Sequence, residues 1–262
     1  MFRLAQHDKI TQMEIIPLGD SALVVRVREQ FEDAPEETLD EVLQILQQLR
    51  SAAIPGVIEL APAYVSVAVF YDPVQVAKAS GQPDRVFHWL KERLRRVTAA
   101  AAERGQRRRT RRNIKSVEIP VCYSPEFAPD LDDVARHAQI STKEVIDLHS
   151  ASQYRVSCIG FVPGFPFLTG LASKLATPRR ATPRKEIPPG SVGIGGAQTG
   201  IYPLRSPGGW NLIGRTPLKL FDPTKNPATL LQAGDRVRFR TITREEFTAF
   251  AEATRAKESL KD

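Results

Sequence analysis

The residues best suited to bind an anion lie in one glycine- and proline-rich stretch, residues 177–223. Its glycines permit positive φ angles and a close approach of the main chain to a ligand. Glycine-rich turns with exposed amides can hold anions, although glycine in a barrel turn is also common for structural reasons alone. The stretch lacks the G-x-x-x-x-G-K-[ST] pattern of a P-loop, and a GxGxxG match would need a strand-to-helix setting that is missing. The chemistry on offer is anion binding outside the known phosphate motifs.

Several cations lie in or near the same stretch. Guanidinium groups bind carboxylate and phosphate through two parallel hydrogen bonds. Arg184 and Arg215 are the better candidates because each lies in a turn bounded by proline, although a single arginine can also be an ordinary surface charge. The full set is Arg155, Arg179, Arg184, Lys185, Arg205 and Arg215.

Two further features precede most of these cations in the sequence. His149 ends a predicted helix, where it either caps the negative helix end or acts as a general acid or base. The run GFVPGFPFLTGL at 160–171 crowds apolar residues around glycines and prolines. It is either a rigid loop packed on the core or the floor of a pocket with Phe161, Phe165 and Phe167 as its walls.

Metal and thiol chemistry have little support in the sequence. The chain has 2 cysteines, Cys122 and Cys158, and they form no CxxC pair, Cys/His cluster or metal-ligand spacing. We interpret both as reduced core thiols, although a catalytic thiol or a disulfide between them stays open. We predict no metal site. Without a Ser-His-Asp order or a paired-carboxylate motif, the residues alone name no reaction.

The elements that must position these residues fall into two predicted domains, 1–102 and 116–262, joined by a basic linker at 103–115. The order of strands and helices in the first domain predicts a small α/β sandwich with helices on one face of a sheet. Its predicted elements are a hairpin over 14–27, a helix over 35–50, a strand over 64–70 and a helix that begins at Pro83.

The second predicted domain is mostly β. It begins with a strand over 117–121, followed by two short helices that start at Asp130 and at Ser141, where S-T-K-E forms a capping box. Short apolar runs then alternate with Gly/Pro turns, which predicts a barrel or sandwich of short strands. The alternating run at 235–242 is typical of a half-buried strand, and a final helix is predicted near 244–257.

Charge and hydropathy argue against several classes of protein. The formal net charge is +7, but residues 103–115 contribute +6 of it and the rest of the chain +1. This run has no aromatic residue and forms no basic stripe, so we interpret it as a solvated linker, or a weak contact for an acidic partner, and predict no nucleic-acid binding. The polar N-terminus is unlike a signal peptide, and no segment approaches the ~20 apolar residues of a membrane span, so we expect a cytoplasmic protein.

Three strings in the second half resemble the KipI/allophanate-hydrolase-subunit-1 family: GFVPGFPFLTGL, TPR-x-x-IPPGSVGIGGAQTGIYP and SPGGWNLIGRTP-x-x-LFDP. PLGDSALVV near the start and LLQAGDRVRF near the end are similar to the same family, so the resemblance covers nearly the whole chain. It implies an α+β and mostly-β fold, with a small N-terminal α/β sandwich followed by a C-terminal cyclophilin-like β-barrel. Related domains form the carboxyltransferase part of urea carboxylase. The Arg-rich run at 103–115 is unusually basic for the family.

The resemblance also implies a function. Family members look like the B subunit of ATP-dependent 5-oxoprolinase, which opens 5-oxo-L-proline to L-glutamate. The B subunit pairs with the C subunit (KipA-like), and the A subunit (LamB/YcsF-like) completes the activity, so the chain alone should be inactive. ATP, with Mg²⁺, is the implied cofactor, at a site that the partner protein can share. The alternative is a regulatory protein like KipI, which inhibits a sensor histidine kinase. A prolyl isomerase is a weaker interpretation, because fold does not carry function.

Candidate residues for such a site follow from the same motif block. Arg184, Lys185 and Arg215 would contact phosphate or the substrate carboxylate, and the main-chain amides from Gly193 to Gly196 would assist them. The candidate catalytic residues are His149, Arg184 and Arg215. The candidate substrate-binding residues are Phe161, Pro163, Gly164, Phe165, Lys185, Gly193, Gly195, Gly196 and Gln198.

Overall fold

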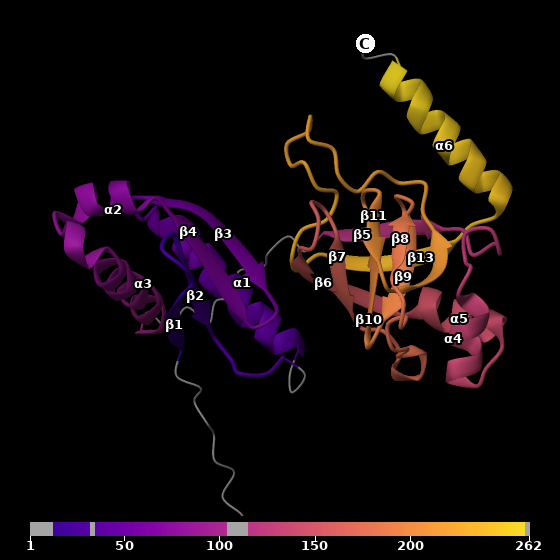
Figure 1. Ribbon diagram of the computed structural model, residues 1–262, viewed down its shortest axis with the longest axis horizontal. Helices are drawn as coiled ribbons and strands as arrows, with labels where there is room; N and C mark the ends of the chain where they lie inside the picture. The colour runs from indigo at the N-terminus through magenta and orange to yellow at the C-terminus, as the bar shows by residue number, and fades with distance from the viewer. Residues whose placement is uncertain (1–12, 32–34, 104–114, 260–262) are drawn as a thin grey trace, which may run out of the picture. The chain divides into compact units, whose positions relative to one another are not determined.

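The chain divides into two compact units, Met1–Arg112 and Asn113–Asp262 (Figure 1). Both units combine helices with β-sheet, so the predicted mixed class is confirmed. The basic run predicted as a linker lies almost wholly outside the described residues. The computed structural model describes residues 13–31, 35–103 and 115–259.

The sheet of the first unit is antiparallel throughout. In β4 (Ser66–Tyr71), every second side chain is buried, as expected of a strand with one covered face. The buried side chains are Val67, Val69 and Tyr71. The predicted hairpin over 14–27 is confirmed, with Ile15 opposite Val25. In spatial order the strands are β1 (Glu14–Pro17), β2 (Ala22–Arg26), β4 (Ser66–Tyr71) and β3 (Val57–Ala63).

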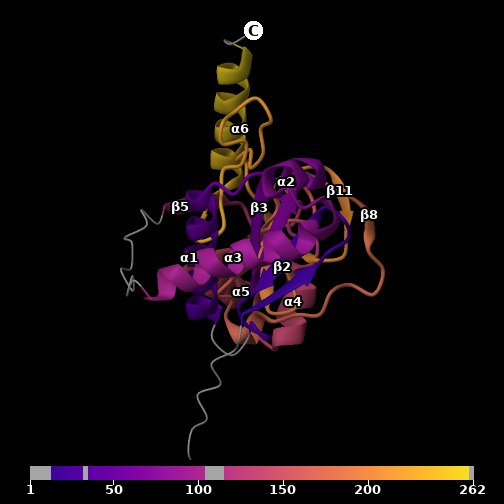
Figure 2. The ribbon, with the colours of Figure 1, turned by 90° about the vertical axis from the view of Figure 1, so that its left-hand side faces the viewer.

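Helices α1 and α3 pack against each other, and α1 also contacts β3 and β4 (Figure 2). The predicted apolar stripe of the first helix is buried, as its helical spacing requires. The sequence pattern does not predict the short helix after β4, because Asp72-Pro73 there indicates only the end of a strand. Asp72 is instead the N-cap of this helix and Pro73 its first residue. The elements are α1 (Pro35–Ala52), α2 (Pro73–Ser80), η1 (Pro83–Arg85) and α3 (Val86–Glu103).

The second unit is built on a sheet of short strands. The β5–β13 pair is parallel, and the other pairs along the sheet are antiparallel. A separate two-stranded ribbon joins β8 (Arg184–Ile187) and β11 (Ser206–Gly208). In spatial order the sheet is β5 (Ser116–Val121), β13 (Arg236–Thr241), β6 (Gln153–Ile159), β7 (Pro166–Thr169), β10 (Gln198–Ile201), β9 (Ser191–Gly195) and β12 (Asn211–Arg215).

The two end strands of this sheet, β5 and β12, meet at a single residue pair. Just after β5, Cys122 exchanges two backbone hydrogen bonds with Arg215, with N···O distances of 2.8 and 2.9 Å. An isolated bridge of this kind is not a strand ladder. The sheet is therefore not closed into a barrel, and the predicted cyclophilin-like barrel is not confirmed.

Two helices of the second unit pack on this sheet: α4 contacts β12, and α5 contacts β13. The predicted capping box is confirmed: the Ser141 hydroxyl accepts from the Glu144 backbone N–H at 3.2 Å, and the Glu144 carboxylate accepts from the Ser141 backbone N–H at 2.9 Å. The predicted C-terminal helix is also present. The elements are α4 (Leu131–Ala138), α5 (Thr142–Ala151), η2 (Ser173–Leu175) and α6 (Arg244–Ser259).

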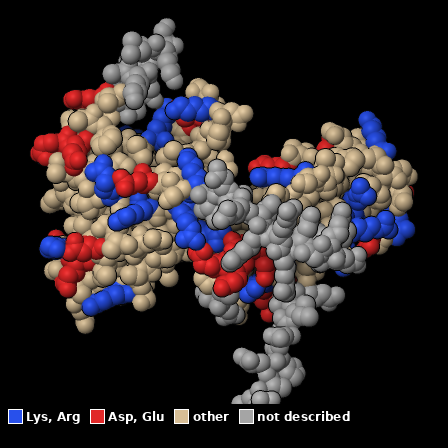
Figure 3. All heavy atoms as spheres, turned by 180° about the vertical axis from the view of Figure 1, so that it is seen from behind, with Lys and Arg blue, Asp and Glu red and all other residues tan. Residues whose placement is uncertain are grey.

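Charges of both signs are interspersed over the face of the molecule that Figure 3 shows. Within the described part of the chain, every helix is too short or too polar to cross a membrane.

Candidate functional site

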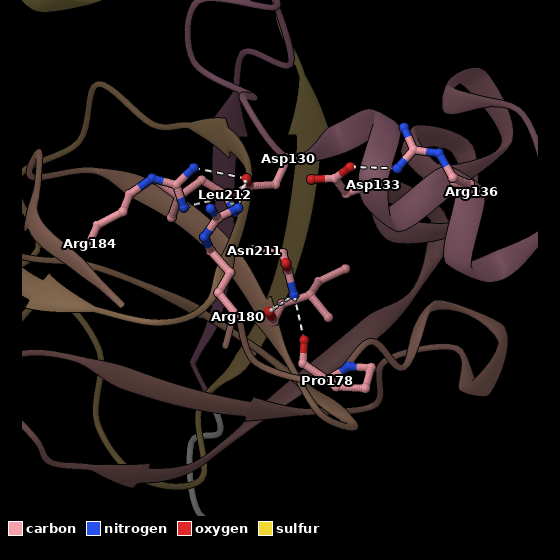
Figure 4. A network of polar contacts seen from close by, with 9 residues as sticks. Asp130, Asp133, Arg136, Pro178, Arg180, Arg184, Asn211 and Leu212 are labelled. Carbon is pink, nitrogen blue, oxygen red and sulfur yellow. Dashed lines mark hydrogen bonds and ion pairs between the residues drawn. The ribbon is translucent and has the colours of Figure 1, made fainter. Parts of the chain in front are cut away.

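A buried carboxylate lies at the centre of the candidate site. Asp130 occupies the N-cap position of α4 and is 1% exposed, but its side chain makes no capping bond to that helix. The carboxylate instead accepts from the guanidinium groups of Arg180 and Arg184 and from the backbone N–H of Leu212 (Figure 4). We call these four groups the Asp130 network.

The geometry of the Asp130 network is that of charge-assisted hydrogen bonds. Arg184, the first residue of β8, binds both carboxylate oxygens with two N–H donors at 2.8 Å. Arg180 donates once, at 2.6 Å, and the Leu212 amide donates at 2.7 Å. Both guanidinium side chains stay partly exposed, at 33% for Arg180 and 25% for Arg184. The predicted site residue Arg184 therefore has a fixed partner and one face toward solvent, whereas Lys185, next along β8, is exposed.

Aromatic side chains pack together on the same unit. Phe165, Tyr202 and Trp210 are buried, with the ring of Phe165 5.1 Å from Tyr202 and 5.5 Å from Trp210. Phe167 packs against both Phe165 and Trp210. Phe161 is 61% exposed and meets Phe165 and Tyr202 with its ring edge-on. We call these five residues the aromatic cluster; its rings contact one another, and Phe161 is its exposed member.

The turn that carries Phe161 is held in an unusual conformation. Phe161 has φ +65°, in the left-handed region that a bulky residue rarely adopts. Gly164 has φ +83°, and a Cβ there would lie 2.9 Å from Phe221. Pro163 lies between them and is exposed. This turn presents one aromatic ring, that of Phe161, outward.

The glycines predicted to bind anions are largely committed to the sheet. Gly193 and Gly195 lie in β9, which pairs with β10 on one side and β12 on the other. The Gly196 N–H donates to the Thr177 carbonyl at 2.8 Å. A Cβ on Gly195 would lie 2.6 Å from the Trp210 ring, so this glycine is needed for close packing. Their amides do not form the exposed nest that the sequence predicts.

Two other predicted residues lie near β9. Gln198 is half-buried and begins β10, opposite Gly195. Arg215 ends β12, donates to the Pro189 carbonyl at 2.9 Å and lies over the Phe127 ring at 5.7 Å. Burial, and then the charge of Arg205, lower the pKa of Arg215. Arg184 and Arg215 thus have separate partners.

His149 lies in the core and is 0% exposed. Its Nδ1 lies 2.8 Å from the Tyr123 hydroxyl, and its Nε2 lies 3.0 Å from the Thr199 hydroxyl. The Thr199 hydroxyl donates to the Gly193 carbonyl, so Nε2 must carry the imidazole proton and Nδ1 must accept from Tyr123. Burial lowers the pKa of His149 from 6.5 to about 3. In this position the ring has no access to a substrate, which favours a structural role over the predicted acid–base role. We call this run of hydrogen bonds the His149 chain.

Both cysteines are free thiols, with Cys122 buried and Cys158 half-buried. Burial raises the pKa of Cys158 to about 11, so this thiol is a poor nucleophile at neutral pH. Among the residues that the structure describes, we find no group of three or more His, Cys, Asp or Glu side chains that could hold a metal ion.

Two cavities lie away from the residues predicted from sequence. One of about 480 Å³ is in the first unit, between α1, α3 and Val27, and one of about 500 Å³ lies beside α5 and β13 in the second. Arg184 and Arg215 line neither of them.

The acceptor at the centre of the site is not predicted from the sequence. The sequence pattern indicates Asp130 only as a helix start, and it does not single out Arg180, Tyr202 or Trp210. The feature that distinguishes Asp130 is that its side chain makes no capping hydrogen bond to α4. This feature is visible only in the three-dimensional structure. Arg180 and Arg184 follow Asp130 in the sequence by 50 and 54 residues.

The fold of this chain is similar to part of a known carboxylase structure. The chain resembles the crystal structure of the Kluyveromyces lactis urea carboxylase, with a TM-score of 0.67, 20% identity, and coverage of 91% of this chain and 22% of that one. At that identity the likeness concerns the fold alone, which is that of one segment of a much larger enzyme.

The chain belongs to the family described as carboxyltransferase domain, subdomain C and D, whose model matches residues 13–231. It is 44% identical over 239 residues to the B subunit of 5-oxoprolinase from Bacillus subtilis (strain 168), covering 91% of this chain and 97% of that protein. The crystal structure of TTHA0988 is similar, with a TM-score of 0.67 and 34% identity. That match covers 85% of this chain and 40% of the other, so the chain spans less than half of that longer protein.

Proposed function

We propose that this chain is the B subunit of an ATP-dependent 5-oxoprolinase, which opens 5-oxo-L-proline to L-glutamate together with other subunits. The observation that carries the proposal is the match to the Bacillus subtilis B subunit, which runs over 97% of that protein at 44% identity. A match of this length includes both units of the fold, so it does not rest on one shared motif.

The chemistry of the reaction explains what such a protein must supply. A lactam carbonyl is a poor electrophile. Transfer of the terminal phosphoryl group of ATP to its oxygen, with ADP as the leaving group, makes the carbon easier for water to attack. Positive groups near the phosphate and donors on the substrate carboxylate stabilise the charges involved. The second unit offers Arg184 and Arg215 at partly exposed positions and Lys185 at an exposed one. We assign these three side chains to anion contacts.

The remaining parts of the activity belong to the complex. We assign the nucleotide, with Mg²⁺ bound to its phosphates, to a site shared with the C subunit (KipA-like), and we assign the A subunit (LamB/YcsF-like) to completing the hydrolase. Support for a shared site comes from β9, where Gly193 pairs with both β10 and β12 and Gly195 pairs with β10. This strand is thus engaged within the sheet of this chain. The alternative role, inhibition of a sensor histidine kinase, stays a prediction.

Reconstitution tests the proposal directly. The chain is purified with the C and A subunits, and L-glutamate release from 5-oxo-L-proline is followed with and without ATP. We expect release only when all three proteins and ATP are present, and none from this chain alone. A mixture of the other two proteins that releases glutamate equally fast without this chain would refute the proposed function.

A further inference from the structure

The Asp130 carboxylate has no remaining capacity to accept hydrogen bonds. One oxygen accepts from Arg180 at 2.6 Å and Arg184 at 2.8 Å, and the other accepts from Arg184 at 2.8 Å and Leu212 at 2.7 Å. An ionised carboxylate offers about four lone-pair sites, so these four donors saturate it. Any further donor in the Asp130 network needs another acceptor.

Arg180 has such a donor. Arg184 donates two hydrogen bonds to the Asp130 carboxylate, one to each oxygen, whereas Arg180 donates one. The Nε–H of Arg180 is buried and has no hydrogen-bond partner among the described residues. Leaving a buried donor unpaired is unfavourable. Two guanidinium charges on one carboxylate also leave the Asp130 network with a net charge of +1.

A third guanidinium lies close by and adds to this excess. Arg179 stacks over the Trp210 ring at 5.8 Å and is exposed. Burial raises the pKa of the Tyr202 hydroxyl, and the Trp210 backbone and then the charges of Arg179 and Arg184 partly oppose this rise. Tyr202 therefore connects the arginines to the aromatic cluster, whose exposed member Phe161 meets Tyr202 edge-on.

We propose that Arg179 and Arg180 form a binding site for the carboxylate of a small cyclic acid, with Arg184 held by Asp130 as the fixed wall of the site and Phe161 as its apolar wall. With Arg179 the excess rises from +1 to +2, so charge alone does not separate a carboxylate from a phosphate dianion. The ligand class rests on the proposed function, in which the substrate carries one carboxylate on a five-membered lactam.

Binding to the full chain tests this assignment. Affinities for 5-oxo-L-proline and for 2-pyrrolidinone, the same ring without the carboxylate, are measured by NMR titration. We expect the acid to bind at least about tenfold more tightly, as loss of a charge-assisted hydrogen bond implies. R180Q, which leaves Asp130 with Arg184 and the Leu212 amide, is expected to lose about the same factor.

Matched variants separate binding from folding. R205Q makes the same change at an exposed arginine that pairs with Glu186, and it should bind like the unaltered chain. R179Q removes a charge without breaking a described ion pair, so it serves if R180Q does not fold. Unchanged affinity in a folded R180Q or R179Q would overturn the site. Inorganic phosphate binding more tightly than 5-oxo-L-proline, with the same dependence on Arg180, would overturn the carboxylate assignment.

Failure here is distinguishable from failure of the proposed function. If the complex of three proteins releases glutamate and R180Q raises neither the KM for 5-oxo-L-proline nor its dissociation constant, the function stands and this site falls. If the complex is inactive but the full chain binds the acid in an Arg180-dependent way, the site stands and the function falls.

Discussion

The second unit contains two polar clusters that differ in how their donors and acceptors match. In the His149 chain, Tyr123 donates to His149, His149 donates to Thr199, and Thr199 donates to the Gly193 carbonyl. The run of donors ends on a carbonyl, and the group is neutral and buried. In the Asp130 network, two guanidinium groups share one saturated carboxylate and stay partly exposed.

Whether donors and acceptors are matched, and whether they are buried, distinguishes structural polar groups from binding groups better than residue type does. A histidine is the commonest acid–base catalyst, yet here the imidazole is enclosed and its hydrogen-bonding capacity is met. An aspartate at a helix start is ordinary, yet here the buried Asp130 binds two guanidinium groups that stay partly exposed and leave a net positive charge. Matched and buried groups set the fold, whereas unmatched and half-exposed groups are available to a ligand.

The largest expected effect is acid destabilisation through His149. Its pKa is about 3 in the folded chain against an ordinary value of 6.5, so folding favours the neutral ring. The stability it contributes is complete above pH 6.5 and is lost as pH falls toward 3. At about 1.4 kcal/mol per pKa unit, the full loss amounts to roughly 5 kcal/mol. Urea unfolding at several pH values between 7 and 3 measures it.

The control for this prediction is H149F, which keeps a ring next to Phe239 but cannot titrate. Other groups titrate equally in both proteins, so the difference between the two stability curves isolates His149. Equal pH dependence in the two proteins between pH 6.5 and 3 would show that His149 is not held neutral by the fold.

The next effect comes from the Asp130 network. D130N removes the counter-charge of two guanidinium groups and replaces one acceptor by a donor. Breaking a buried ion pair costs about 3–5 kcal/mol, and we expect the lower end because both arginines keep some solvent contact. The free energy of unfolding in urea is the measurement. D133N, at an exposed pair with Arg136, should change it by less than about 0.5 kcal/mol; comparable costs would remove the distinction between the two sites.

Features of the second unit were predictable only where they depend on neighbours in sequence. The capping box at Ser141 and the half-buried strand β13 follow from spacing alone, and both are confirmed. The contact of Asp130 with Arg184 crosses 54 residues, and no local rule links them. The role of His149 likewise depends on Thr199, which another strand brings against it. Site chemistry that depends on hydrogen-bond partners far apart in the sequence could not be predicted from the sequence.

A smaller effect is expected from Y123F. The change leaves the His149 Nδ1 acceptor buried without its donor, while the ring still packs. An unsatisfied buried acceptor costs about 1–3 kcal/mol. In the H149F background the same change should cost less, because the acceptor is already gone. A double-mutant cycle on unfolding free energies measures this coupling, and additive costs would contradict a continuous chain of hydrogen bonds.

The smallest effect distinguishes two neighbours on β8. Arg184 and Lys185 lie side by side in sequence, but successive side chains of a strand point to opposite faces. Arg184 reaches Asp130 while Lys185 is exposed. K185Q should therefore change the free energy of unfolding by less than about 0.5 kcal/mol, whereas R184Q, which removes the bidentate partner of a buried carboxylate, should cost several times more. Urea unfolding of the two variants decides the point. Equal costs would mean that Asp130 gains little stability from the two hydrogen bonds of Arg184.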